Sequence, residues 1–247
     1  MQLHRDEYEG YHQIQKRGKS NSVNEVDSLG AKLTKKHLTR RELENRLGKA
    51  MMTVKKLKDF FTKANCNVAW KLQVYNAVIV SRLLYGLESL ELIDSLKTRL
   101  DAFQIRGLRQ ILKIKHSFWS HTSNIEIIVK ANMTVERAEH IDWQQFIVCR
   151  DIKDMKVKLI SQMLEDRKVR LLGHILRCDE RDPLIAVTLD SDYKRLMFDK
   201  RRVGRPRNHW TEMTMNSAYQ KVYDCTFEVN DDTHRLMLIT AALDRLF

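Results

Sequence analysis

Proline and glycine are scarce in this sequence, and their scarcity argues against sheet-rich folds. The 247 residues include two prolines and eight glycines, well below the ordinary usage of about 5% and about 7%. Tight turns between strands use both residues heavily, whereas helix interiors exclude them. We therefore predict a mostly α fold, a multi-helix bundle with little or no sheet.

Features that define several other protein classes are also missing. The four cysteines (Cys66, Cys149, Cys178 and Cys225) form no Cys-x-x-Cys pair, so neither a disulfide framework nor a zinc ribbon is indicated. No stretch approaches the ~18 uncharged apolar residues of a membrane span, and the first residues contain no apolar signal core. Gly-x-Ser-x-Gly and phosphate-cradling glycine loops are absent as well. We expect an intracellular protein with no membrane, cofactor or small-molecule substrate.

Basic residues, in contrast, are in excess. Lys and Arg number 44 against 32 Asp and Glu, which gives a formal charge of +12. The excess is concentrated in the first half of the chain and in a short stretch from Lys194 to Arg207, where Asp199 is the only opposing residue. A polyanionic partner is favoured, and RNA or DNA is the commonest one. A generally soluble basic surface is the alternative interpretation.

Apolar residues recur at helical spacing through most of the chain, with polar lead-in residues before them. Thr39–Glu42 and Ser123–Glu126 have the form of capping boxes, and Asn24–Leu33 is a candidate extended segment. We expect helices over about 39–61, 70–87, 94–112, 124–134, 135–151, 153–177, 210–223 and 233–247, with the 153–177 run ended by Asp182-Pro183. Gly48 and Gly86 lie inside these patterns, where close helix–helix approach would explain them.

The composition and the helices together predict four segments. These are an irregular lead-in (1–38), a helical domain (39–180), a basic linker (181–209) and a small helical tail (210–247).

Five stretches in sequence order resemble the C-terminal region of non-LTR (LINE-type) retrotransposon reverse transcriptases. They are Ser28-Leu29-Gly30 followed by Glu42, Arg46 and Ala50; Leu83-Leu84-Tyr85-Gly86-Leu87-Glu88; Phe103 to Leu112; Leu171 to Arg177; and Gly204-Arg205-Pro206-Arg207 with Trp210. Leu90 stands where the family usually has tryptophan, Gly107 where cysteine is common, and Ser28 in place of a tyrosine. The resemblance implies a thumb-like bundle that follows the polymerase core.

The family's RNA-directed DNA polymerase needs paired aspartates, in the form aromatic-x-Asp-Asp, to hold two Mg²⁺ ions. The adjacent aspartates here are Asp231-Asp232, preceded by Val229-Asn230, and we expect them to cap the last helix. In the family the palm and fingers would precede residue 1. We therefore predict no catalytic residues and no polymerase activity from this polypeptide alone.

Two groups of basic residues are the candidate nucleic-acid contacts. Arg99, Arg106, Arg109 and Lys113 are expected on the outer side of the third helix, and Arg82 and Tyr85 lie one turn apart before it. An ordinary amphipathic helix with a basic outer face would look the same.

The second group is a basic run that contains a Gly-Arg-Pro core. Its residues are Lys200, Arg201, Arg202, Arg205 and Arg207, with Trp210 as a possible base-stacking residue. The run resembles an AT-hook that enters a narrow minor groove. A solvated loop and a nuclear-import signal are the alternatives, and Trp210 at helical spacing would also fit a core.

A mixed zinc site is a weaker hypothesis. His174 and Cys178 lie four residues apart on an expected helix, and His209 and Cys225 follow downstream. Because zinc ligands usually come in tight pairs and this set has one pair, we expect no metal and interpret His174 as a packing histidine.

The sequence therefore predicts a nucleic-acid-binding fragment of a reverse transcriptase, with the nucleus favoured over the cytoplasm. A domesticated, non-catalytic structural subunit of a larger assembly is the alternative, with other protein subunits as partners. A decayed element without function is a third possibility.

Overall fold

The computed structural model describes residues 25–28, 31–34, 38–138, 140–148, 155–179, 182–189, 209–228 and 231–247. The chain divides into two units, residues 1–42 and 43–247. In the first unit, β1 (Glu25–Ser28) pairs antiparallel with β2 (Ala31–Thr34), with Glu25 opposite Thr34. The other elements in the described ranges are helices, so the prediction of a mostly α fold is confirmed.

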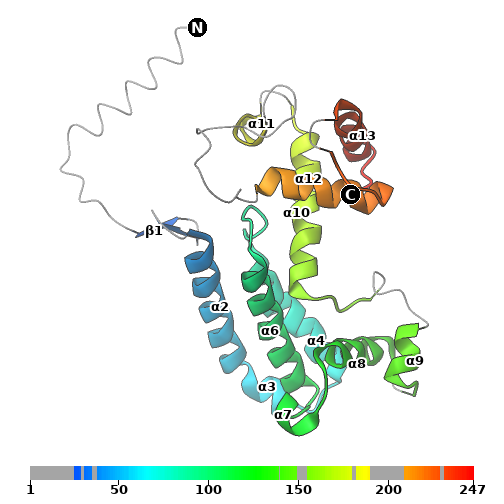
Figure 1. The fold of residues 1–247 in the computed structure, drawn as a ribbon. Coiled ribbons are helices and arrows are strands. Elements are labelled where there is room, and N and C mark those ends of the chain that lie inside the picture. The colour runs from blue at the N-terminus through cyan, green and yellow to red at the C-terminus, as the bar shows by residue number, and fades with distance from the viewer. Residues whose placement is uncertain are drawn as a thin grey trace, which may run out of the picture. The chain divides into compact units, whose positions relative to one another are not determined.

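Figure 1 shows the order of the helices along the chain. They are α2 (Leu38–Lys56), α3 (Lys58–Lys63), α4 (Val68–Val74), the π-helical η1 (Tyr75–Val80), α5 (Ser81–Leu84), α6 (Asp94–Ile111), α7 (Ser117–Ser120), α8 (Asn124–Glu136), α9 (Trp143–Val148), α10 (Ile160–Leu176), α11 (Pro183–Thr188), α12 (Trp210–Tyr223) and α13 (Asp232–Leu243).

The larger hydrophobic core of the second unit lies among the helices from α2 to α8 and the start of α10. Its members come from segments far apart in the sequence. Leu43 of α2, Leu84 of α5, Leu100 of α6, Ile127 of α8 and Leu164 of α10 all have no exposed surface. Burying one such leucine contributes roughly 1.5–3 kcal/mol, so this core holds the bundle together.

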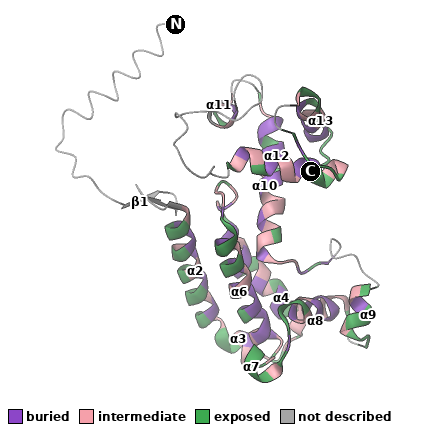
Figure 2. Ribbon diagram, viewed as in Figure 1, coloured by how far each residue is buried: buried purple, intermediate pink, exposed green. Residues whose placement is uncertain are grey.

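The second half of α10 belongs to a different core, which it shares with α12 and α13. Leu172 of α10 packs with Ala218 and Tyr219 of α12 and with Leu238 and Ala242 of α13. Most of α10 is accordingly buried or half-buried (Figure 2). The structure therefore differs from the expected division, because the 210–247 tail packs directly against the end of the 39–180 segment.

The N-terminus of α10 is capped by side chains of α6 rather than by its own flanking residues. Asp101 accepts hydrogen bonds from the backbone N–H of Ser161 (2.9 Å) and from its hydroxyl (2.7 Å). Gln104, which is almost fully buried, accepts from the Ile160 N–H (2.9 Å) and donates to the Lys158 carbonyl (2.8 Å). Since the first N–H groups of a helix have no partner within it, these bonds explain why α10 begins at Ile160.

Several helix boundaries follow the expectations. The helices α6 and α12 begin where predicted, and Ser123 caps α8 by accepting from the Glu126 N–H (3.2 Å). Asp231 caps α13 by accepting from the Thr233 N–H (2.8 Å), so the expected role of Asp231 as a cap is confirmed.

Other boundaries were wrong. The helix α2 begins at Leu38, so Thr39 lies inside it and does not cap it. The expected 135–151 helix is limited to α9 in the described residues, because Arg137 ends α8 with a left-handed φ of 57°.

Asp182-Pro183 starts α11 rather than ending α10. Asp182 accepts from the Leu184 N–H, and proline at the first helical position lacks an N–H that would be unpaired anyway. Gly86 lies in a turn with φ of 71°, not inside a helix.

The tertiary cap of α10 gives a first prediction. Asp101→Ala leaves the Ser161 N–H and hydroxyl without their acceptor, and we expect the free energy of unfolding in urea to fall by about 1–2 kcal/mol. Thr98→Ala is the control on the same helix, because the exposed Thr98 hydroxyl donates only to the Asp94 carbonyl of its own helix; its effect should stay within about 0.5 kcal/mol. Equal effects of the two variants would contradict the cap.

Asp166 joins α10 to α12 and gives a prediction of pH dependence. Its carboxylate accepts from Lys221 (3.0 Å) and lies 3.5 Å from the Lys158 ammonium. Partial burial raises the pKa of Asp166, but the hydrogen bond and charge of Lys221, followed by Lys158, outweigh it and hold the pKa below 3.8. A lowered folded-state pKa stabilises the fold above the unfolded value, and that stabilisation is lost as the pH falls through the folded value.

We expect Asp166→Asn to lower the stability near neutral pH by roughly 0.5 kcal/mol, the size of a partly exposed ion pair. The gap between the melting temperatures of wild type and variant should close as the pH falls below 3.8, the ordinary aspartate value. A gap that stays constant through this range would show that Asp166 does not titrate with its lysine partners.

Candidate nucleic-acid interface

Three of the predicted cations lie on the exposed side of α6 and just after it. Arg106 and Lys113 are exposed, and neither forms an ion pair with any residue that the structure describes. Arg99 is half-exposed and pairs with Glu44 of α2 at 3.0 Å. Arg99 and Arg106 are seven residues apart and so lie on one side of α6, and Lys113 follows the end of the helix with a left-handed φ of 57°. Arg106 and Lys113 therefore offer two exposed positive charges to a polyanion, whereas the charge of Arg99 is balanced by Glu44.

Arg109 does not belong to this surface, and its assignment there was wrong. Its side chain is 8% exposed and donates to the Lys115 carbonyl (2.9 Å), the Ser120 hydroxyl (3.2 Å) and the Thr122 carbonyl (2.5 Å). A position three residues after Arg106 lies about 60° around the helix, which turns Arg109 toward the chain that follows α6. Through these hydrogen bonds, Arg109 anchors the turn formed by residues 112–122.

That turn carries functional candidates that the sequence analysis missed. Phe118 and Trp119 of α7 are each 72% exposed, and Lys115, His116 and His121 beside them are exposed as well. A signal was present in the sequence. Residues 102–125 contain Arg106, Arg109, Lys113 and Lys115 but no Asp or Glu, and they are richer in basic residues than the other long stretch without acidic residues, 60–87.

The second predicted group is only partly placed. Lys200, Arg201, Arg202, Arg205 and Arg207 lie outside the described residues. Trp210 is described, and it starts α12, packs against the second core and donates its indole N–H to the Glu88 carbonyl (2.6 Å). Of the two interpretations of Trp210, this half-buried position favours the core over base stacking.

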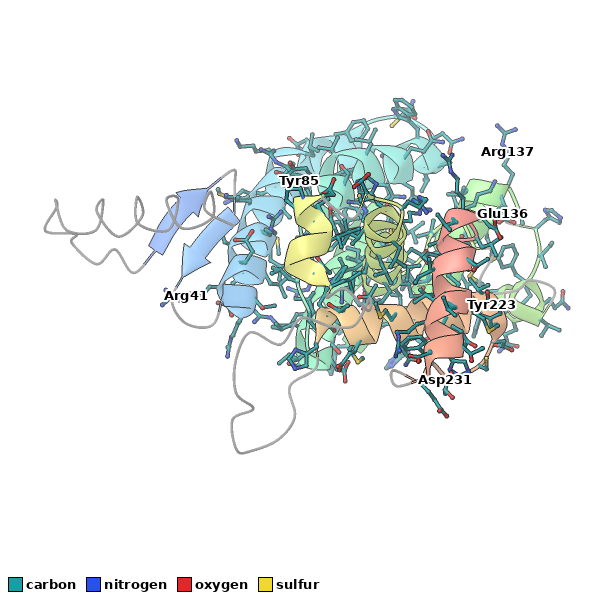
Figure 3. The ribbon with its side chains drawn as sticks, turned by 90° about the horizontal axis from the view of Figure 1, so that it is seen from above. Arg41, Tyr85, Glu136, Arg137, Tyr223 and Asp231 are labelled. Atoms are coloured by element: carbon teal, nitrogen blue, oxygen red, sulfur yellow. The ribbon has the colours of Figure 1, made fainter. Side chains whose placement is uncertain are left out.

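The Leu-Tyr-Gly stretch forms a turn that is fixed from two sides. Arg46 of α2 donates to the Tyr85 carbonyl, and the Glu88 carbonyl accepts from Trp210. The Tyr85 side chain, labelled in Figure 3, remains 69% exposed, and Arg82 one turn earlier is also exposed. Backbone contacts thus hold the turn, while the side chains expected to contact nucleic acid face solvent.

The zinc hypothesis finds no support. The Cys178 sulfur lies 4.0 Å from Nε2 of His174, and its thiol donates to the His174 carbonyl (3.3 Å). In the described part of the chain no three His, Cys, Asp or Glu side chains gather closely enough for a metal. Burial, followed by the charge of Asp182, raises the pKa of the Cys178 thiol. The thiol is therefore protonated near neutral pH.

A shallow hollow of about 520 Å³ lies beside α8 and α9. Leu112, Ile114, Met133 and Trp143 line it together with Lys130 and Asp142. Lys130 pairs with Glu126 of its own helix at 2.7 Å, and Asp142 accepts from the Gln144 N–H (3.1 Å) at the start of α9. Both charged residues thus serve the helices, and the hollow gathers no catalytic pair.

The chain has no match among protein-family models, curated proteins or solved structures. None of the described helices is both long enough and apolar enough to cross a bilayer.

Substitution of Arg109 tests whether its hydrogen bonds hold the turn that follows α6. Arg109→Gln removes the buried guanidinium group and the three hydrogen bonds that it donates. We expect the free energy of unfolding to fall by roughly 2–3 kcal/mol. Amide hydrogen exchange of residues 115–122 should accelerate more than that of α6 itself. Arg106→Gln is the matched control, because the exposed Arg106 donates only to the Ala102 carbonyl of its own helix (3.3 Å). A uniform increase in exchange over the whole chain would instead show general destabilisation.

Proposed function

We propose that this chain is a nucleic-acid-binding fragment similar to the thumb and post-thumb region of a non-LTR retrotransposon reverse transcriptase. It binds RNA or an RNA–DNA duplex through the exposed Arg106 and Lys113, with Arg99, which also pairs with Glu44, as a further contact. The observation that carries the proposal is the set of exposed cations, Arg106, Lys113 and Lys115, on α6 and the turn held by Arg109, with no acidic residue between Asp101 and Glu126 in the sequence. Cations without acidic neighbours neutralise phosphates and release the counterions condensed on them.

The basic run from Lys200 to Arg207 is the second proposed contact, by its composition alone. It would add phosphate contacts or, alternatively, direct nuclear import. The nuclear location is part of the same proposal.

The polymerase chemistry is assigned to a part of the enzyme that this sequence does not contain. Asp231 is committed to the α13 cap, and Asp232 pairs with Arg235 one turn later. Both carboxylates therefore already have local structural roles. We expect purified protein to give no extension of a primed RNA template in the presence of Mg²⁺.

A structural subunit is the second candidate function, and α13 offers an observation in its favour. Leu236 and Leu243 lie seven residues apart, on the same side of the helix, and are 65% and 61% exposed. Apolar residues aligned in this way suit a protein partner. Such a scaffold would bind no RNA and would need its partner for solubility.

The salt dependence of RNA binding tests the proposal. We expect a fluorescent blunt-ended RNA hairpin to bind with an affinity that falls steeply between about 50 mM and about 200 mM KCl. The double variant Arg106→Glu/Lys113→Glu should bind more weakly and reduce the slope of log K against log salt by roughly two units, one for each lost phosphate contact. Fluorescence anisotropy measures both quantities.

The control is Lys156→Glu/Arg170→Glu, which changes the net charge by the same amount at exposed residues that belong neither to α6 nor to the turn after it. It should retain most of the affinity and nearly the full slope. If both double variants lose binding equally, net charge rather than this surface attracts RNA. If wild-type protein binds no RNA at either salt concentration, the scaffold is favoured.

A further inference from the structure

The exposed ring pair on α7 is the feature that the proposed function leaves unused. Phe118 and Trp119 are each 72% exposed, and α7 is largely exposed in Figure 2. The two rings lie edge to face, with centroids 5.2 Å apart and planes at 88°. Neighbouring aromatic residues on a surface usually hide at least one ring in the core, and here neither ring is hidden.

Hydrogen bonds within the turn hold the two rings in this exposed position. The His116 ring nitrogen Nδ1 accepts from the Phe118 N–H (3.3 Å), and the His116 carbonyl accepts from the Trp119 N–H (2.9 Å). Arg109 then bonds both ends of the turn, at the Lys115 and Thr122 carbonyls. The rings therefore project from a braced turn.

The positive charges around the rings favour an anionic ligand. Lys113 and Lys115 precede them, His116 and His121 flank them, and no acidic residue occurs between Asp101 and Glu126. Sites that bind single-stranded nucleic acids combine aromatic rings, which stack on bases, with cations, which contact the phosphates. A membrane surface fits less well, because α7 is a single turn whose other residues are Ser117 and Ser120, whereas helices that lie on membranes present a long apolar face.

We propose that the α7 turn binds the unpaired bases of a single-stranded nucleic acid. Phe118 and Trp119 stack on bases, Lys113 and Lys115 contact the adjoining phosphates, and Arg109 is the positioning residue that holds the turn. The proposal rests on the proposed function and refines it, since it adds a single-stranded contact to the duplex contact of α6. A junction between duplex and single strand would engage both parts.

Two probes test the proposal on the full chain: an unstructured oligouridylate of about 20 nucleotides and the blunt RNA hairpin. We expect Phe118→Ala/Trp119→Ala to weaken binding of the oligouridylate by about 10- to 100-fold and to leave binding of the hairpin within about twofold. Trp119→Phe keeps an aromatic face and should restore most of the affinity. Because stacking quenches indole fluorescence, the quenching by oligouridylate should be smaller in Trp119→Phe although the oligonucleotide still binds.

Trp70→Ala is the matched control, since Trp70 of α4 is 55% exposed and does not belong to the α7 turn. It should change neither affinity. If the alanine variant binds oligouridylate as wild type does while the hairpin still binds, the stacking proposal is wrong and the proposed function stands. If wild-type protein binds neither probe, the proposed function fails as well. Ring-dependent binding to phosphatidylserine vesicles, without binding of oligouridylate, would also overturn the proposal in favour of a membrane contact.

Discussion

A fully buried ammonium group, that of Lys168, lies where α10 passes from one hydrophobic core to the other. Its Nζ is 2.8 Å from Glu91 and 3.4 Å from Glu165, and Lys97 of α6 completes the group at 2.8 Å from Glu165. Burial opposes the charged form of Lys97, but the hydrogen bond and charge of Glu165, followed by Glu91 and Asp94, raise its pKa. A buried charge left without its partner typically costs several kcal/mol, so the loop before α6 must remain where Glu91 reaches α10. The ion group thereby ties α10 to α6 and to the loop before it, at the point where α10 leaves the larger core.

The same loop explains why the stretch that carries the family resemblance is structural as well as exposed. Tyr85 and Glu88 accept hydrogen bonds through their carbonyls, from Arg46 and Trp210, and Glu91 follows three residues later. One short connection therefore contacts α2, α10 and α12. Backbone acceptors leave the side chains of this connection available, and Tyr85 remains exposed. A similar division holds at α7, where Arg109 bonds carbonyls and the rings face solvent.

Local chemistry predicted a large part of the fold. The helix that begins at Trp210, the Ser123 cap and the Asp231 cap depend on residues within one turn of each other, and the structure contains all of them. The start of α10 could not be predicted in this way, because its capping groups, Asp101 and Gln104, lie about sixty residues earlier in the sequence. The shared second core was missed for the same reason, since periodicity shows which face is apolar but not which helix covers it.

For the candidate site, sequence spacing identified the exposed Arg106 and Lys113 and misplaced Arg109. Arg109 lies at the edge of the basic side, where a long side chain can turn either to water or to the next loop. Three acceptors on that loop decide the direction, and no local pattern reveals them. Trp210 is a comparable case, because its partner is a carbonyl 122 residues away. The exposed Phe118 and Trp119 were overlooked because an aromatic pair in a short helix is typical of a core.

The close approach of α6 to η1 has a consequence for how this sequence can change over time. A Cβ at Gly107 would lie 2.6 Å from the ring of Tyr75, and that ring is almost completely buried. The Tyr75 hydroxyl has no hydrogen-bond partner among the described residues, and burial raises its pKa far above the ordinary value, so the ring is held by packing alone. Position 107 therefore cannot acquire a side chain unless position 75 becomes smaller or its ring moves. A side chain at position 107 should therefore be tolerated only together with a smaller residue at position 75, and the two positions should change as a pair.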